Sequence, residues 1–210
     1  MKRIFTRPIG VPIVLYILSG LTILFAAATS IQMLLDALPP ESLRYKDTPI
    51  SFLGHAIGGV AFGVIDPLQF GRVLARKYGR LHRVLGRVFV AAGAFLSLSS
   101  LTLLWEFPDT NGVVVNAGRL VFGIALGIAL IFAMVAIKRR NIPAHRDWMI
   151  RAYAIGMGAT LVAIFFIPIF VITGEPPMGL ASDILFIGSW AACVVFAEWL
   201  IRRINKGAYK

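Results

Sequence analysis

Six long apolar stretches separated by short loops are the feature that most constrains the fold of this chain. They run over approximately residues 12–35, 51–70, 85–105, 115–137, 151–173 and 183–201. A helix needs about 20 apolar residues to cross a bilayer, and within so short a segment only a helix satisfies all of its own backbone hydrogen bonds. We therefore expect an all-α polytopic membrane protein, with residues 1–210 forming a single domain of six transmembrane helices.

The composition agrees with a membrane protein and excludes one soluble class. The chain is 58% hydrophobic and 15% charged, whereas a soluble domain is typically about 45–50% apolar and about 25% charged. A formal net charge of +11 would also suit a nucleic-acid-binding protein. However, the positive charge is distributed by membrane side and is not gathered on one soluble module, so we expect no nucleic-acid partner.

The loop charges predict the orientation in the membrane. All but three of the 21 Lys and Arg residues lie in the N-terminal segment, in every second loop or in the C-terminal tail, the exceptions being Arg44, Lys46 and Arg119. The positive-inside rule then places both termini in the cytoplasm. Anionic lipids of the cytoplasmic leaflet are the expected partners of these basic loops.

The first apolar stretch has an alternative interpretation as a signal peptide. The run Ala26-Ala27-Ala28 resembles a small-residue cleavage site, but apolar residues continue through Leu35. The apolar core of a signal peptide is usually about 7–15 residues long. We expect an uncleaved first span; cleavage would leave five spans and the same orientation of the C-terminus.

Two of the basic loops each carry a His-Arg pair, at His82-Arg83 and at His145-Arg146. Each pair stands where a helix is expected to begin, so free backbone N–H groups and the positive end of the helix dipole favour an anion there. Arginine adds planar donors suited to carboxylate or phosphate groups. The arginines in question are Arg83, Arg87, Arg146 and Arg151.

Several ligands suit these two motifs. Lipid headgroup phosphates, an anionic substrate such as a quinol or a pyrophosphate lipid, and the propionates of a haem would each find cationic partners. In the haem case, His82 and His145 are the predicted iron ligands if their helices are neighbours, because imidazole commonly holds haem iron. The alternative is that both motifs are interfacial anchors that contact lipid phosphate, helix ends and neighbouring carboxylates.

Two further residues, His55 and Asp66, are candidates for chemistry. His55 lies near the outer end of the second span, roughly 21 Å of helix from Gln69, so we assign it to a separate outer site that could hold a divalent metal with nearby carboxylates. Asp66 lies about one turn from the inner end of the same span, where an ionisable group is costly unless paired and is often functional. Asp66 could form a structural ion pair or take part in a proton relay, and the sequence does not decide between these two roles. Glu198 is expected to extend toward the interface or to pair with Arg202 in its own helix.

The order and spacing of these residues resemble a known bacterial family. The quoted run is His55-x-x-Gly58-Gly59 … Pro67-Leu68-Gln69-Phe70 … Leu81-His82-Arg83-x-x-Gly86-Arg87 … Ala144-His145-Arg146-x-Trp148-Met149-Ile150-Arg151-x-Tyr153. It resembles the predicted membrane-protein family catalogued as domain of unknown function two-three-zero-six, over roughly residues 50–170. The resemblance implies a multi-pass helical protein of the bacterial cytoplasmic membrane. Family members often have Gly-Pro where this chain has Asp66-Pro67, so the resemblance implies no family-wide role for Asp66.

The sequence thus predicts a membrane protein with a redox role, in which haem or a metal binds at the cytoplasmic interface. Two alternatives stay open. The first is a transporter or lipid-handling protein that binds an anionic substrate through Asp66 and the basic loops. The second is a non-catalytic assembly partner of a larger membrane complex, or a homo-oligomer, in which the histidines only stabilise helix ends.

Overall fold

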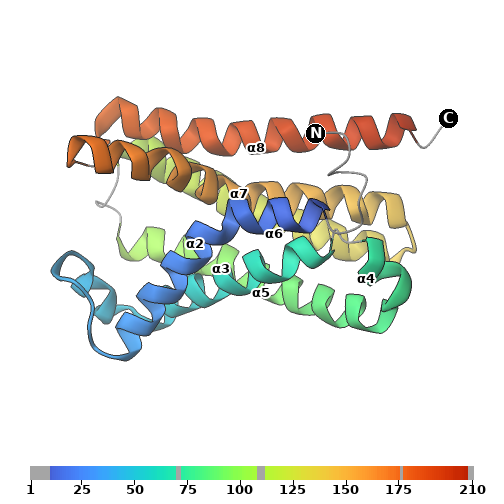
Figure 1. Cartoon of the computed structure of the whole chain (residues 1–210), viewed down its shortest axis with the longest axis horizontal. Coiled ribbons are helices and arrows are strands. Elements are labelled where there is room, and N and C mark those ends of the chain that lie inside the picture. Colours follow the sequence, from blue (N-terminus) through green and yellow to red (C-terminus); the bar gives the residue numbers. More distant parts are fainter. Residues whose placement is uncertain (1–9, 70–71, 108–111, 176, 208–210) are drawn as a thin grey trace. The chain divides into compact units, whose positions relative to one another are not determined.

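The computed structural model describes residues 10–69, 72–107, 112–175 and 177–207, which form helices joined by short connections (Figure 1). In chain order these are α2 (Gly10–Leu34), the 3-10 helix η1 (Pro40–Asp47), α3 (Pro49–Gln69), α4 (Arg72–Lys77), α5 (Gly79–Glu106), α6 (Val113–Lys138), α7 (Ile142–Thr173) and α8 (Gly179–Gly207). Six helices of the described ranges are long and apolar enough to cross a membrane: α2, α3, α5, α6, α7 and α8. The prediction of an all-helical fold with six such helices is confirmed.

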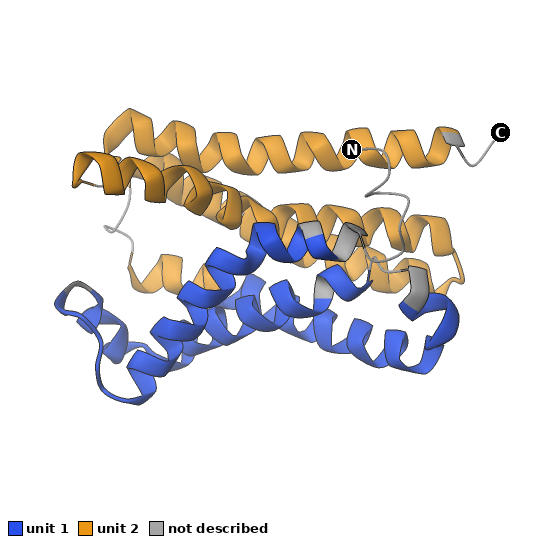
Figure 2. Cartoon of the chain, viewed as in Figure 1, with its two compact units in different colours: residues 1–99 blue, residues 100–210 orange. Residues whose placement is uncertain are grey.

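The chain divides into two compact units (Figure 2). Unit 1 comprises residues 1–99 and contains α2, η1, α3, α4 and most of α5. Unit 2 comprises residues 100–210 and contains the last turns of α5 together with α6, α7 and α8. Each unit has its own packed interior.

In unit 1, α3 and α5 pack through aromatic rings and a glycine. Phe62 and Phe89 are both buried, and their rings stack with centroids 4.3 Å apart. A Cβ atom at Gly58 would lie 3.2 Å from the Ala92 carbonyl oxygen. The small residue therefore allows the two backbones to approach closely, as helix contacts in lipid require.

A hydrogen bond joins α2 to α3 near a proline. The Tyr16 hydroxyl donates to the Val64 carbonyl oxygen over 2.6 Å. Pro67 lies inside α3 and has no N–H, so the carbonyl four residues earlier, at Gly63, loses its usual partner. Polar groups of a neighbouring helix commonly bond the backbone around such a proline, and Tyr16 reaches the carbonyl next to Gly63.

In unit 2, α7 packs against both α6 and α8 through small side chains. Ala133 of α6 and Ala152 of α7 are completely buried. At Gly158 of α7, a Cβ atom would overlap the ring of Trp190 in α8. Phe122 of α6 stacks on the same ring, with centroids 5.2 Å apart. The three helices thus share one interior.

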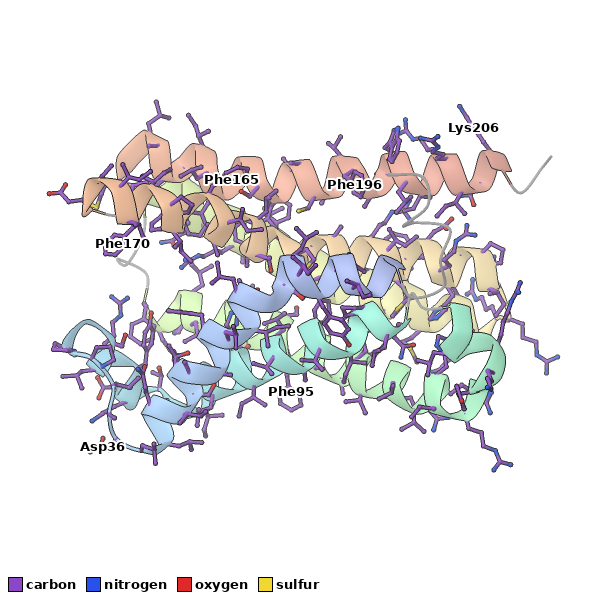
Figure 3. All side chains as sticks on the ribbon, viewed as in Figure 1. Asp36, Phe95, Phe165, Phe170, Phe196 and Lys206 are labelled. Atoms are coloured by element: carbon purple, nitrogen blue, oxygen red, sulfur yellow. The ribbon has the colours of Figure 1, made fainter. Side chains whose placement is uncertain are left out.

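Many large apolar side chains point away from the packed interiors. The four phenylalanines labelled in Figure 3, Phe95, Phe165, Phe170 and Phe196, are all exposed. So much exposed apolar surface is rare on a soluble monomer and is the normal state of a helix surrounded by lipid acyl chains.

Two helices begin several residues before the starts of the spans predicted for them. α5 starts at Gly79 and α7 at Ile142, so His82 and His145 lie inside helices. Both His-Arg motifs lie in the first turns of their helices, so the expected helix starts are confirmed, whereas the assignment of the motifs to the preceding loops is wrong. A helix need not end where its apolar residues end, because its backbone groups remain bonded to one another when it continues into the polar interface.

Candidate functional site

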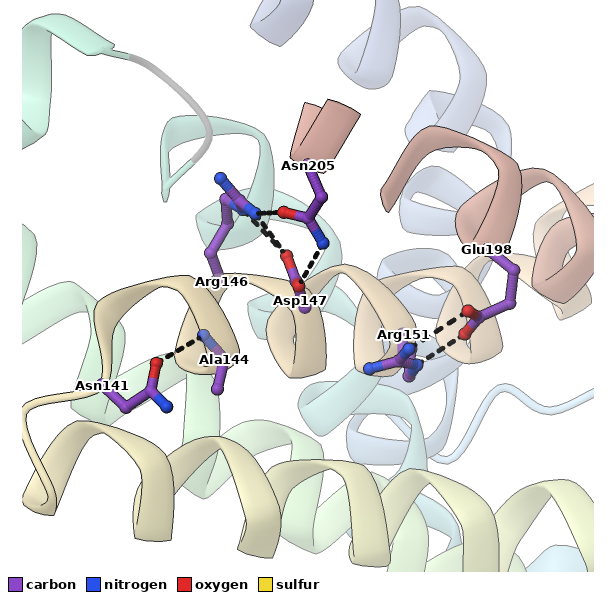
Figure 4. A network of polar contacts seen from close by, with 7 residues as sticks. All are labelled: Asn141, Ala144, Arg146, Asp147, Arg151, Glu198 and Asn205. Atoms are coloured by element: carbon purple, nitrogen blue, oxygen red, sulfur yellow. Dashed lines mark hydrogen bonds and ion pairs between the residues drawn. The ribbon is translucent and has the colours of Figure 1, made fainter. Parts of the chain in front are cut away.

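An ion pair between α7 and α8 is the central feature of the candidate site. Arg151 donates from Nε to Glu198 Oε1 over 2.5 Å and from Nη2 to Oε2 over 3.1 Å (Figure 4). The two parallel bonds form a bidentate pair, the strongest arrangement for arginine and carboxylate. The side chains are 28% and 34% exposed, so the pair is neither a surface contact nor fully enclosed.

This contact corrects one expectation from the sequence. Glu198 was expected to extend to the interface or to pair with Arg202 one turn along its own helix. It binds Arg151 of α7 instead, while Arg202 lies on the exposed side of α8. Packing of α8 on α7 brings the two side chains together, and the guanidinium offers two aligned donors at once.

Aromatic rings connect the ion pair to α6. The Arg151 guanidinium carbon lies 4.6 Å from the centroid of the Trp148 ring. That ring stacks on Phe132 of α6, with centroids 4.8 Å apart. A cation over an aromatic face is stabilised by about 0.5–1 kcal/mol at exposed sites and more when desolvated. All three helices therefore help to fix Arg151.

A pocket of about 230 Å³ lies beside the ion pair, within unit 2. It is open on one side, and its walls are almost entirely apolar. Its lining residues are Ala125, Ile128 and Ala129 of α6, Trp148, Arg151 and Ile155 of α7, and Val194, Ala197 and Glu198 of α8. The two charged residues in this lining are the members of the ion pair.

A second polar cluster ties the end of α8 to the start of α7. Arg146 donates from Nε and Nη2 to Asp147 Oδ1 over 2.9 and 2.7 Å, and from Nη2 to Asn205 Oδ1 over 2.5 Å. Asn205 Nδ2 donates to Asp147 Oδ2 over 3.0 Å and closes the ring of bonds. Both Arg146 and Arg151 thus bind carboxylates of this chain, and their role toward a ligand stays a prediction.

The start of α7 is already well bonded. Asn141 is its N-cap, with Oδ1 accepting from the Ala144 N–H over 3.1 Å, and the His145 N–H donates to the Asn141 carbonyl. Pro143 has no N–H. The first turn therefore leaves few backbone donors for the anion that the sequence suggested at this helix start.

The imidazole of His145 has a defined orientation. Its Nδ1 lies 2.9 Å from the backbone carbonyl oxygen of Ala133 in α6. A carbonyl can only accept, so Nδ1 carries the hydrogen and donates it. In the neutral ring, Nε2 then keeps its lone pair.

The corresponding motif in unit 1 lies in the first turns of α5. Arg83 and Arg87 are exposed, and His82 is half-buried. The His82 N–H donates to the Tyr78 carbonyl over 3.0 Å, so this turn also has fewer free donors than expected. Because His82 belongs to unit 1 and His145 to unit 2, a joint site of the two histidines stays a prediction.

Gln69 lies close to the same face of α5. Its Oε1 is 3.5 Å from the position that a Cβ atom would take at Gly86. Gly86 follows His82 by one helical turn, so the two share a face of α5. The structure therefore brings Gln69 near the His82 face of α5, a relationship that spacing in the sequence did not indicate.

The structure describes the surroundings of His55, the candidate for an outer metal site, but not the side chain of Asp66. His55 Nδ1 lies 3.3 Å from Ser99 Oγ, and that hydroxyl donates to the Phe95 carbonyl over 2.6 Å. Within the described residues, no group of three or more His, Cys, Asp or Glu side chains could hold a metal ion. Haem and metal binding thus gain no support here. The Asp66 side chain lies outside the described part of the chain.

Two polar residues of the site were missed. Asn141 precedes the Ile-Pro start of α7, and asparagine before a proline in the first helical turn is a recognised N-cap pattern that could have identified it. Asn205 has no such pattern. Asn205 reaches Arg146 only because α8 continues past the apolar stretch and runs beside the first turns of α7.

One comparison with known proteins gives a match. The family model described as Predicted membrane protein (DUF2306) matches residues 52–201. That region includes the ion pair, the pocket and both His-Arg motifs. No curated protein and no solved structure matches the chain.

Proposed function

Because the chain belongs to the predicted membrane-protein family DUF2306, we propose that it is a membrane lipid-binding protein that holds one amphipathic molecule in the pocket of unit 2. The observation that carries this proposal is the Arg151–Glu198 pair in the wall of an otherwise apolar pocket. Ligand sites typically combine an apolar lining with a few polar groups that orient the ligand. Here the polar head would contact the pair, and the apolar body would lie against the aliphatic side chains.

The lining of the pocket supports an amphipathic ligand. The pocket of about 230 Å³ is open on one side, and its almost entirely apolar walls offer water few partners. Ionisable residues within membrane helices are also commonly functional.

The loop charges suggest where this site faces. The basic ends of α6, α7 and α8 coincide within unit 2, because Lys138, His145 and Lys206 lie at ends of successive antiparallel helices. The positive-inside rule supports a cytoplasmic location for this end, and the family resemblance supports a bacterial cytoplasmic membrane. The ligand would then enter from the cytoplasmic leaflet.

The test compares two neighbouring valines of α8. Val194 lines the pocket, whereas Val195 is 69% exposed and is not among the lining residues. In lipid nanodiscs, native mass spectrometry should show bound lipid on the wild type and on Val195→Trp, and a loss of roughly tenfold in occupancy for Val194→Trp. Equal occupancy in the two variants would refute the proposal.

A redox role remains a second candidate because of one observation. Histidines that bind metals usually donate their other ring nitrogen to a carbonyl or carboxylate, and His145 Nδ1 meets the Ala133 carbonyl in this way. A Soret band in the purified protein that His145→Ala or His82→Ala removes would support haem. A colourless protein after haem supplementation would refute it.

Transport and assembly predict other results. Proton-linked transport predicts that Asp66→Asn blocks uptake and leaves the helical content unchanged. An assembly role predicts subunits that co-purify in fixed stoichiometry.

A further inference from the structure

The hydrogen bonds that Arg151 already makes indicate which functional group a ligand of the pocket would carry. A guanidinium has five N–H donors. Two of them, one on Nε and one on Nη2, are used by Glu198. Nη1 donates to no residue that the structure describes. Arg151 lines the pocket, so its remaining N–H groups are available to a hydrogen-bond acceptor on the ligand.

The charge of the pair argues against an anion. Glu198 neutralises Arg151 through two direct contacts, so the wall of the pocket carries no net charge. A phosphate or carboxylate would bring an uncompensated charge into this apolar pocket, because Glu198 already neutralises Arg151, and the cost of removing that charge from water would be offset only in part. An uncharged acceptor avoids this desolvation cost.

The position of Arg151 along α7 suggests which acceptor is available. From Arg151 to the end of α7 at Thr173, the helix rises roughly 33 Å. This length is close to the thickness of the hydrocarbon core, about 30 Å. If α7 crosses the membrane with its apolar part, Arg151 stands at the boundary of that core, where lipids carry ester carbonyl oxygens and not charged phosphates.

We infer that the pocket binds an apolar molecule through an uncharged carbonyl oxygen, which accepts hydrogen bonds from the free donors of Arg151, while Glu198 neutralises Arg151 and so disfavours anionic headgroups. This inference rests on the proposed function of the same pocket. Two sources share this chemistry: the ester carbonyl of a glyceride and the ring carbonyl of a quinone. The pocket of about 230 Å³ encloses the carbonyl-bearing part, and the remaining chain lies in the bilayer.

The experiment measures binding to the full-length protein in nanodiscs by native mass spectrometry, with three ligands. Diacylglycerol and phosphatidic acid with the same acyl chains differ by one phosphate, and a short-chain isoprenoid benzoquinone represents the second source. The expected result is that diacylglycerol or the quinone binds roughly tenfold more tightly than phosphatidic acid. Whichever neutral ligand binds identifies the source. Equal or tighter binding of phosphatidic acid, or binding of neither neutral ligand, overturns the inference.

Two variants test the roles of the pair. Glu198→Gln keeps the shape and removes the negative charge, so phosphatidic acid should bind roughly tenfold more tightly than to the wild type. Arg151→Met should weaken binding of the neutral ligand about tenfold, whereas the exposed Arg202→Met should not. No change in either variant would also overturn the inference, and the wild-type ligand series decides the question if a variant fails to fold.

The two proposals fail in distinguishable ways. If Val194→Trp binds each of the three ligands as tightly as Val195→Trp does, the pocket is not the binding site and the proposed function fails. If Val194→Trp alone loses binding but phosphatidic acid binds as tightly as diacylglycerol, the pocket is confirmed and only its preference for an uncharged carbonyl is wrong.

Discussion

The Trp190 indole N–H of α8 donates a 3.0 Å hydrogen bond to the Ile155 carbonyl oxygen of α7. The same ring occupies the space in front of Gly158. One side chain thus satisfies its own donor and fills the gap that the glycine leaves. The contact shows how closely α7 and α8 approach in the middle of unit 2.

Gly158→Ala should be strongly destabilising, because its methyl group would overlap the Trp190 ring. Overpacking of this kind typically costs about 1–3 kcal/mol. Gly188→Ala in α8 is the matched control, since nothing lies within 4 Å of a Cβ there, and alanine is the better helix former. Denaturant titration in detergent micelles measures both variants; equal free energies of unfolding would contradict the close contact.

The Arg151–Glu198 pair should show coupling in a double-mutant cycle. Arg151→Met and Glu198→Gln should each destabilise the protein, and the double variant should lose about 1 kcal/mol less than the sum of the two, because the second change removes no further contact. The cycle of Arg202→Met with Glu198→Gln should be additive. A coupling energy between Arg202 and Glu198 would mean that Glu198 pairs within its own helix.

The cluster of Arg146, Asp147 and Asn205 should hold the end of α8 in place. Asn205→Leu would leave Arg146 and Asp147 each with one bond fewer, at a cost of about 1–2 kcal/mol. Amides in the last two turns of α8 should then exchange hydrogen faster. Lys206→Leu, at the exposed neighbouring position, should leave their exchange unchanged, and the same rate in both variants would argue against the cluster.

The N-cap at Asn141 can be tested by a conservative pair of substitutions. Asn141→Ala removes the acceptor for the Ala144 N–H and should lower the free energy of unfolding by about 1 kcal/mol. Asn141→Asp keeps an oxygen at the same place and should stay within a few tenths of the wild type. Similar losses in both variants would show that the side chain does more than cap the helix.

The membrane fold could be predicted from the sequence because apolar length carries most of the information. Each predicted span lies within or close to a helix of the structure. The helix ends could not be predicted from apolar length, since α5 and α7 continue into their charged segments. The close contacts at Gly58 and Gly158 depend on which side chain of the neighbouring helix faces each glycine, so they follow from the packing and not from apolar length.

Less of the candidate site than of the fold could be predicted from the sequence. Arg151 was identified from its motif, but its partner Glu198 lies in another helix, and no local spacing links the two. Pairing across helices depends on how α7 and α8 rotate about their axes, which a single sequence does not encode in any short pattern. The pocket follows from the same packing and was likewise unpredictable.

The balanced charge of the Arg151–Glu198 pair also bears on how unit 2 responds to an energised membrane. An electric potential does work on net charge, about 2.3 kcal/mol for each elementary charge carried across 100 mV. Oppositely charged groups that move together experience nearly cancelling forces. A pair joined by two direct bonds therefore contributes almost no net charge that a voltage could move, so binding of the proposed ligand should be the same in polarised and depolarised vesicles.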